Sequence, residues 1–403
     1  MSVIAALLAL AGAATTTGPA ATAPAQPAPQ ATHVSARNVP LETGLARSTL
    51  AEGLENPWAV AFLPDGGMLV TERPGRLRLI SGGQLRPEPV AGVPAVFARG
   101  QGGLLDIALH PGFASNGLVY FTYSAGTAEA NQTRVARARF DGTALIDWTD
   151  IFAVPQLKPG GQHFGARLAW MADGTLLVSI GDGGNPPNRL DGRLIRENAQ
   201  DPSSALGKVL RMTDTGAAPS DNPMAGQPGM AAFIWSMGHR NIQGLAIDSA
   251  TGAVWANEHG ALGGDELNRI QRGGNFGWPL ASVTREYVGG AEVGQPETVL
   301  GMLPPVLRWE VATAPSGLVV YRGSAFAAWQ GDVLSGGLRS VDVRRVDLDA
   351  DGRVVGETAI GVGARVRDVR QGPDGAIYVL TDERNGRLIR IAPEAPAAAP
   401  AAR

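Results

Sequence analysis

The amino-acid sequence predicts an all-β fold, a six-bladed β-propeller whose strands are joined by long loops. Six segments repeat one pattern, in which an apolar strand, a turn with Gly or Asp-Gly and a second apolar strand follow one another. No helical pattern lies between these hairpins, which favours a propeller over a β-sandwich. The 54 Gly and 29 Pro residues among 403 agree with an all-β chain, because Gly costs about 1 kcal/mol and Pro about 3 kcal/mol inside a helix.

The six hairpin units account for most of the chain. An Asp-Gly turn or a close relative between alternating strands is the strongest local signal of a hairpin. About 350 folded residues divided by six leave roughly 58 per unit, enough for a four-stranded blade and an insertion, whereas two β-sandwich domains are the alternative. The spacing is widest around residues 185–235, and loops of that length usually carry function. The units cover residues 58–80, 104–123, 166–182, 242–258, 317–335 and 366–391.

Charge and cysteine content exclude several functional classes. With 34 Lys+Arg and 37 Asp+Glu the formal net charge is −3, which argues against a nucleic-acid binder that depends on phosphate neutralisation. The sequence contains no Cys, which excludes a disulfide framework, a zinc-thiolate site and a cysteine nucleophile. It also has no Gly-x-Ser-x-Gly elbow, Walker loop or His-Glu-x-x-His motif.

Both ends of the chain differ in composition from the hairpin region. An apolar run at residues 3–14 is too short to span a bilayer, and Ala/Thr/Pro-rich sequence follows it. This pattern resembles a secretory signal with a flexible tether, so we expect a periplasmic or secreted protein without stable membrane insertion; a disordered Ala-rich tail is the alternative. We therefore divide the chain into residues 1–39 (signal-like segment and tether), 40–393 (propeller) and 394–403 (disordered Ala/Pro tail).

Two polar residues flank the hairpin of the third unit. His163 follows a Pro/Gly loop just before the strand that begins near Ala166, and Asp182 closes the partner strand in SIGDGG. We expect both side chains at one blade edge, facing the central channel. An imidazole with an ordinary pKa near 6.5 suits a general base, and an adjacent Asp would orient it. The alternatives are a loop His bonded to the backbone and an Asx-turn.

Two further polar strings accompany the fourth unit. Residues 238–244 read GHRNIQG, which places Arg240 and Asn241 just before a strand. Arg240 suits a fixed cation that faces a developing oxyanion, and a structural ion pair is the alternative. Residues 258–268 read EHGALGGDELN. Carbonyls and carboxylates of such a loop suit Ca²⁺, although the spacing is not that of an EF-hand, and a polar hairpin loop is the alternative.

Four more polar residues occupy comparable positions near the strands of other units. A closed ring would bring them together on one face, and that face would be basic. It would suit an anionic cofactor or a substrate with carboxylates, although each charge taken alone is compatible with simple solvation. These residues are Gln101, Arg339, Arg365 and Arg367.

Six strings occur together in one order: GQGGLLDIALHP, HFGARL, IGDGG, GHRNIQGL, EHGALGGDELN followed by GGNFGWP, and RVRDV. Each is a weak signal alone, and the ordered set is a strong one. With this set the chain resembles the soluble pyrroloquinoline-quinone (PQQ)-dependent aldose dehydrogenases, the glucose/sorbosone dehydrogenase family. The resemblance implies a six-bladed β-propeller, in agreement with the six units counted from the pattern.

The resemblance also implies roles for residues at matching positions. His163 in HFGARL is the general base, and Asp182 orients it. Arg240 and Asn241 contact PQQ, and Arg240 also stabilises the oxygen that becomes negative. The other residues implied to contact the cofactor are Gln101, Arg339, Arg365 and Arg367.

A Ca²⁺ ion that polarises the quinone is part of the same resemblance. Two main-chain carbonyls hold it, here those of Gly260 and Ala261, and Asp265 supports it. The family usually has Pro where this chain has Ala261, which holds the turn less rigidly. Many members have Lys where this chain has Arg339, and the two side chains are not equivalent donors.

The resemblance implies an oxidoreductase that converts aldoses to aldonolactones. A chain without Cys has no haem-attachment motif, so electrons would leave to an external acceptor such as a quinone, a cytochrome or a dye. We expect a monomer or homodimer. Two alternatives from other classes are a metal-dependent propeller lactonase and a non-catalytic binding propeller.

Overall fold

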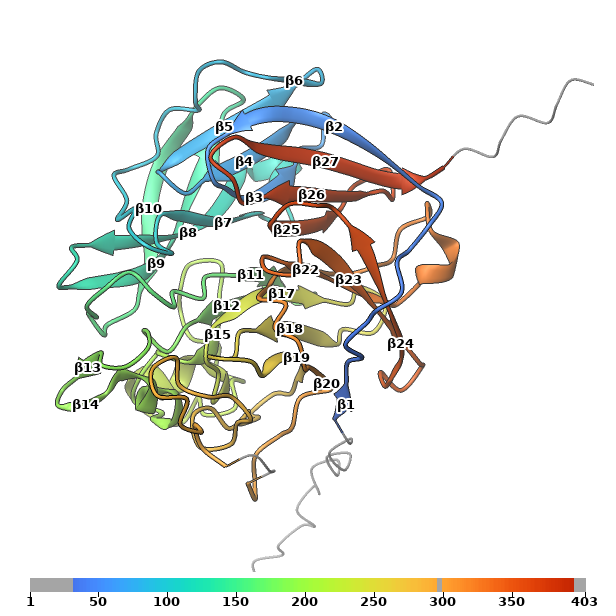
Figure 1. Cartoon of the computed structure of the whole chain (residues 1–403). Coiled ribbons are helices and arrows are strands. Elements are labelled where there is room, and N and C mark those ends of the chain that lie inside the picture. Colours follow the sequence, from blue (N-terminus) through green and yellow to red (C-terminus); the bar gives the residue numbers. More distant parts are fainter. Residues whose placement is uncertain (1–31, 296–298, 395–403) are drawn as a thin grey trace, which may run out of the picture.

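The computed structural model describes residues 32–295 and 299–394. Within them, six sheets of mainly antiparallel strands surround a central axis as the blades of a propeller (Figure 1), and the predicted fold class is confirmed. The signal-like run at residues 3–14 and the tail from residue 395 onward lie outside the described residues. None of the described helices is long and apolar enough to cross a membrane.

The first three blades follow one another along the chain, each beginning with its innermost strand. Every one of them starts within a predicted hairpin unit, or within two residues of it. Blade one contains β3 (Pro57–Phe62), β4 (Met68–Glu72), β5 (Arg76–Ser81) and β6 (Gln84–Leu85); blade two contains β7 (Leu104–Leu109), β8 (Leu118–Gly126), β9 (Asn131–Phe140) and β10 (Leu145–Ala153); blade three contains β11 (Leu168–Trp170), β12 (Leu176–Ile180), β15 (Lys208–Met212) and β16 (Ile234–Met237).

The last three blades repeat this arrangement, and two of them include a strand from the N-terminal region. Blade four contains β17 (Ile242–Ile247), β18 (Val254–Glu258), β19 (Asp265–Ile270), β20 (Leu307–Trp309) and β1 (His33–Val34); blade five contains β21 (Pro315–Val320), β22 (Val333–Gly337), β23 (Asp342–Leu348) and β24 (Val354–Gly361); blade six contains β25 (Val366–Gln371), β26 (Ile377–Thr381), β27 (Gly386–Pro393) and β2 (Leu45–Leu54).

The remaining described elements lie in the loops between strands. Among the loops that hold these elements, the widest joins β12 to β15 in blade three and overlaps the long interval around residues 185–235 that the sequence predicts. The interval between β19 and β20 is longer still. These elements are the hairpin β13 (Arg189–Leu190) and β14 (Arg193–Leu194), the short helix α1 (Phe113–Asn116), and the 3₁₀ turns η1 (Ile195–Gln200), η2 (Gly229–Phe233) and η3 (Ala327–Trp329).

The core lies between neighbouring blades. In five blades the second strand is buried at every residue, because other blades cover both faces of its sheet. Such strands read as nearly continuous apolar runs, as LLVSI in β12 and IYVLT in β26 do. Apolar side chains from adjacent sheets meet there, as Leu69 of blade one and Phe121 of blade two do in one cluster.

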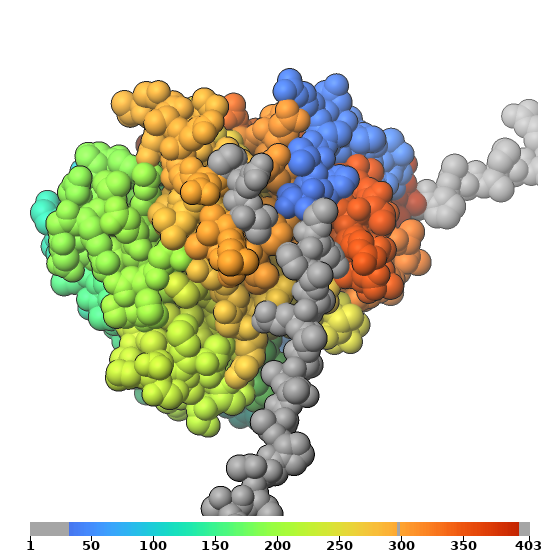
Figure 2. Space-filling view, turned by 90° about the horizontal axis from the view of Figure 1, so that it is seen from below, coloured from blue at the N-terminus to red at the C-terminus, as the bar shows by residue number. Residues whose placement is uncertain are grey.

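The ring closes through the N-terminal strand β2. It pairs antiparallel with β27, from Leu45 opposite Pro393 to Leu54 opposite Gly386, and so becomes the outer strand of the last blade. Figure 2 shows these early residues (blue) beside the late ones (red). β1 lies before residue 40, where we expect the propeller to begin, and it pairs in parallel with β20. Closure satisfies strand edges that an open array would leave exposed.

A buried arginine connects the inner strands at the centre of the ring. Arg167 precedes β11 and forms ion pairs with Asp368 at 2.8 Å and with Asp106 at 3.3 Å. Its Nε donates to the carbonyl of Gln243 at 2.6 Å, and its guanidinium lies 4.1 Å from the ring centre of Trp58. Since a buried charge needs such partners, this cluster ties together five of the six blades beneath the candidate site.

Candidate active site

The predicted site residues lie on one face of the propeller for a topological reason. In an antiparallel pair, the start of the first strand and the end of the second lie at the same sheet edge. His163 precedes the inner strand β11 and Asp182 follows its partner β12, while Arg240 precedes β17. Repetition of this geometry around a ring gathers polar groups from several blades at one end of the central channel.

His163 and Asp182 form a buried hydrogen-bonded pair. The imidazole Nδ1 lies 2.6 Å from Oδ1 of Asp182, and the side chains are 3% and 1% exposed. The other oxygen of Asp182 accepts a hydrogen bond from Nε1 of Trp278 at 2.8 Å. The Gly184 amide also donates to Oδ1. With both its oxygens engaged, Asp182 fixes the ring orientation and leaves Nε2 of His163 free to exchange a proton.

The electrostatic surroundings favour a neutral His163 beside an ionised Asp182. Burial lowers the pKa of His163, and the positive charge of Arg240 lowers it further, so that these effects outweigh Asp182. For Asp182, burial acts to raise the pKa, but His163 and Arg240 outweigh it and the net pKa is lowered. A neutral imidazole held by a carboxylate is the form required of a general base.

Arg240 is held by neutral oxygen atoms rather than by a carboxylate. Its Nη1 donates to the carbonyl of His259 at 3.1 Å, and its Nη2 donates to Oδ1 of Asn185 at 2.7 Å. The carboxylate of Glu258 accepts the main-chain N–H of Arg240 at 2.6 Å and does not bond to its guanidinium group. Nε of Arg240 is buried without a hydrogen-bond partner among the described residues. This cation is therefore available to an anionic group.

A cavity of about 190 Å³ lies next to the His163–Asp182 pair, and we call it the arginine cavity. Phe164 and Gly165, which follow His163 in the chain, form part of its wall. Arg367 is 8% exposed; its Nη2 pairs with Asp382 at 3.0 Å, while its buried Nε has no partner in the described chain. Arg365 pairs with the same carboxylate at 3.2 Å. The cavity is lined by Trp58, Arg73, Gln101, Leu105, Phe164, Gly165, Gln243, His259, Ala314, Leu338, Arg365, Arg367 and Asp382. Three arginines against one carboxylate make its wall basic.

Gln101 and Asn241, which we predict to contact a cofactor, hold the His163 loop. Oε1 of Gln101 accepts the His163 N–H at 2.8 Å. Oδ1 of Asn241 accepts the Gly165 N–H at 3.2 Å, and Nδ2 of Asn241 is buried without a partner in the described chain. That unpartnered N–H₂ group is a donor available to a ligand.

Arg339 stands apart from the other predicted cofactor contacts. It follows β22 with an exposed side chain, whereas its neighbour Leu338 lines the arginine cavity. The cation that takes part in the cavity wall instead is Arg73, which the sequence analysis does not single out. Its Nη1 donates to the carbonyl of Gly100 at 2.6 Å.

The structure shows how the loop after β18 is held. Asp265 uses one carboxylate oxygen to accept the Gly260 N–H at 3.0 Å and the other to accept the Ala314 N–H at 2.7 Å. The Ala261 N–H donates to Oγ1 of Thr284 at 2.7 Å. Asp265 thus fixes the turn rather than facing outward. Among the described residues, no three His, Cys, Asp or Glu side chains cluster as a metal site, so a cation here would depend on main-chain carbonyls.

The two lysines of the sequence brace the loops around the site. Nζ of Lys158 donates to the carbonyl of Gln162 at 2.6 Å and lies 3.9 Å from the ring centre of Phe164. Nζ of Lys208 donates to three carbonyls within η1 and its following loop. Burial lowers the pKa of each lysine to about 7. These contacts hold the loop before His163 and the loop that precedes β15.

Several residues of the site escape recognition from sequence. His259 lies in the EHG string and lines the arginine cavity, and its Nε2 bonds to the carbonyl of Pro315 at 2.7 Å. Trp278 lies in GGNFGWP and reaches Asp182 from the next blade. Both strings mark the resemblance, but no local pattern shows where these two side chains point.

The family model described as Glucose / Sorbosone dehydrogenase matches residues 54–390. The chain belongs to the glucose/sorbosone dehydrogenase family. It is 40% identical to aldose sugar dehydrogenase YliI of Escherichia coli K12 over 359 residues, which cover 85% of this chain and 92% of YliI. The recognition of the family from sequence is confirmed, and so is the enzyme class of a sugar-dehydrogenase oxidoreductase.

Solved structures of glucose/sorbosone dehydrogenase relatives agree with the propeller. The soluble aldose sugar dehydrogenase of Escherichia coli in its apo-form superposes with a TM-score of 0.81 at 38% identity, covering 87% of this chain and 99% of that chain. The PQQ-bound form of aldose sugar dehydrogenase from Streptomyces coelicolor has a TM-score of 0.68 at 29% identity, with 88% and 100% covered.

Proposed function

We propose that this protein oxidises aldoses at C1 to aldonolactones with PQQ and Ca²⁺. The observation that carries the proposal is the buried His163–Asp182 pair beside a cavity with three arginines in its wall. The PQQ-bound relative from Streptomyces coelicolor supports the choice of cofactor.

The residues present fit an anionic quinone. Nε of Arg240, Nε of Arg367 and Nδ2 of Asn241 are buried donors that lack partners within the described residues, and guanidinium groups bind carboxylates well. Ca²⁺ prefers hard oxygen ligands, which the main-chain carbonyls of Gly260 and Ala261 would provide. We assign the PQQ contacts to Gln101, Arg240, Asn241, Arg365 and Arg367; Arg339 and the metal-supporting role of Asp265 remain predictions from the resemblance.

His163 would remove the proton of the anomeric hydroxyl. Its Nδ1 proton is committed to Asp182, so Nε2 carries the lone pair that accepts this proton. Asp182 then stabilises the imidazolium that forms, and Arg240 provides a fixed positive charge for oxygen that becomes negative. PQQ, when bound, supplies the electrophilic carbonyl that takes up the hydride released from C1.

Reconstitution of the purified apoprotein tests the proposal. Addition of PQQ and Ca²⁺ should give dye reduction with a panel of aldoses. His163→Ala should retain PQQ binding and reduce turnover by about 10²–10⁴-fold, the usual contribution of a general base. His33→Ala, on the exposed strand β1, is the matched control. Absence of both PQQ binding and dye reduction would refute the proposal, and PQQ-independent lactone hydrolysis would favour the lactonase alternative.

We also propose that electrons leave to an external acceptor and that the protein acts in the periplasm or outside the cell, as a monomer or homodimer. The apolar run at residues 3–14 supports export. Fractionation of the native host and chromatography with light scattering would test these points.

A further inference from the structure

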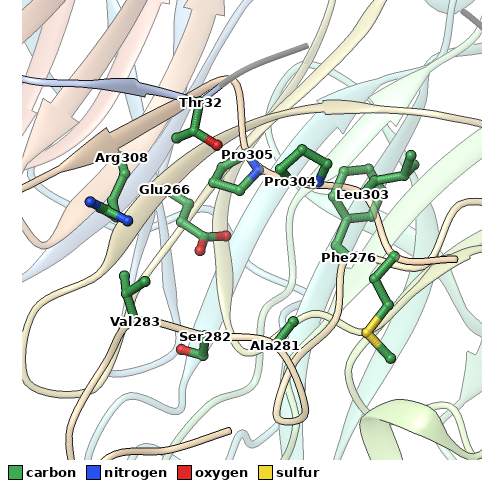
Figure 3. Close-up of a pocket in the computed structure, with 11 residues that line it drawn as sticks. Thr32, Glu266, Phe276, Ala281, Ser282, Val283, Leu303, Pro304, Pro305 and Arg308 are labelled. Atoms are coloured by element: carbon green, nitrogen blue, oxygen red, sulfur yellow. The ribbon is translucent and has the colours of Figure 1, made fainter. Parts of the chain in front are cut away.

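A second cavity lies in blade four and is separate from the arginine cavity. It has a volume of about 350 Å³ and shares no lining residue with the arginine cavity. We call it the blade-four cavity. Its walls come from β19, β20 and the loops between these two strands, together with Thr32 (Figure 3). It shares Glu266, Phe276, Ala281 and Ser282 with a small pocket that Arg240 and Gly260 also line. The proposed reaction assigns no role to these four shared residues.

One end of the blade-four cavity carries two opposite charges that do not pair. Glu266 and Arg308 stand directly opposite each other in the β19–β20 register, where such side chains usually attract each other. No ion pair joins them within 4.0 Å among the described residues. Glu266 has one weak hydrogen bond, from Asn268 at 3.4 Å. Figure 3 shows their charged ends side by side above Val283 and Ser282, with a space between them.

The other end of the cavity is apolar. Phe276 and Leu303 lie there, and Pro304 and Pro305 form the adjoining wall (Figure 3). Glu266 also stands opposite the Glu258 carboxylate in the β18–β19 register, and no ion pair reaches it within 4.0 Å in the described part of the chain. A ligand for this space would combine a cationic group, an anionic group and a hydrocarbon part.

We propose that the blade-four cavity binds a small zwitterion with an apolar side chain, of the α-amino acid class. The ligand carboxylate would accept hydrogen bonds from Arg308, because guanidinium–carboxylate pairs are strong and directional. Its ammonium group would donate to Glu266, and its side chain would pack against Phe276 and Leu303. An α-amino acid carries both charges around one carbon, which suits two protein charges that are cross-strand neighbours yet too far apart to pair.

Titration calorimetry on the full chain with L-leucine tests this assignment, and it is independent of PQQ and of turnover. L-Leucine should bind saturably. L-Leucinamide, which lacks the carboxylate, and 4-methylpentanoate, which lacks the ammonium group, should each bind roughly 10–100-fold more weakly, the value of one charge-assisted hydrogen bond. These comparisons use the unaltered protein, so they do not depend on whether a variant folds.

Two variants locate the site. Arg308→Met should weaken L-leucine but leave L-leucinamide unchanged, and Glu266→Gln should weaken L-leucine but leave 4-methylpentanoate unchanged. Arg353→Met, whose side chain is 59% exposed, is the matched control and should bind L-leucine normally. The proposal is overturned if L-leucine does not bind, if either site variant binds it as the unaltered protein does, or if D-glucose competes for the site, which would indicate a polyol ligand.

Discussion

Nδ1 of His163 lies 2.6 Å from Oδ1 of Asp182, and the other Asp182 oxygen accepts the indole N–H of Trp278. The carboxylate is thus held from two directions, by its own blade and by the loop after β19. This arrangement permits one tautomer of the imidazole, with the proton on Nδ1.

Asp182→Asn should impair catalysis by disturbing that tautomer. An amide at this position presents a donor to either Nδ1 or Trp278, so the ring loses its fixed proton arrangement. We expect the turnover number to fall about 10²–10⁴-fold, measured by dye reduction at saturating PQQ. Asp65→Asn, in an exposed turn of blade one, should change turnover little. Unchanged turnover in Asp182→Asn would show that Asp182 does not orient the base.

The pH profile of the reaction should reflect the lowered pKa of His163. A base must be unprotonated, so activity is lost as the pH falls through the pKa of His163. Because burial and Arg240 lower that pKa, the acid limb of kcat/KM for the aldose should lie below pH 6.5, the ordinary value for His. An acid limb above pH 6.5 would contradict either the assignment of His163 as base or its burial.

Arg367 and Arg339 should differ sharply in their effect on PQQ affinity. Arg367→Met removes a buried guanidinium from the arginine cavity and should weaken PQQ binding roughly 10–100-fold, measured by equilibrium quenching of tryptophan fluorescence. Arg339 is exposed outside that cavity, so Arg339→Met should bind PQQ nearly as the unaltered protein does. Equal losses in the two variants would mean that the loop after β22 turns inward when the cofactor binds.

Gly260→Ala should disturb the proposed Ca²⁺ loop. A Cβ at this position would clash with the main-chain carbonyls of Gly263 and Gly264, so the turn and its own carbonyl must shift. We expect a higher Ca²⁺ concentration for half-maximal reconstitution with PQQ. Gly226→Ala is the control, because a Cβ there meets open space. A normal Ca²⁺ requirement in Gly260→Ala would place the ion elsewhere.

The sequence predicts the blades better than the way in which the ring closes. Asp-Gly turns and apolar strands are local features, and all six predicted hairpins lie at the starts of blades. The pairing of β2 with β27 joins the two ends of the propeller, and no periodicity in β2 indicates that partner. The central position of Arg167 is likewise hidden, because its partners come from other blades.

In the candidate site, too, local sequence patterns identify some residues, whereas others are identified only by the tertiary structure. His163, Asp182 and Arg240 are recognisable because each adjoins a strand within a characteristic string. Arg73 and Trp278 become part of the site only when different blades meet, so their roles depend on tertiary structure. Arg339 is the opposite case. Its position along the chain resembles that of Arg365 and predicts a cofactor contact, but its side chain is exposed.

The burial of both lysines has a practical consequence for handling the protein. The sequence contains Lys158 and Lys208 as its whole set of lysines, and they are 2% and 0% exposed. The folded chain therefore presents no lysine amine to an amine-reactive reagent. Acylation of lysine would report unfolding rather than surface chemistry, and covalent attachment to an electrode through lysine amines would require lysines engineered onto the outer strands.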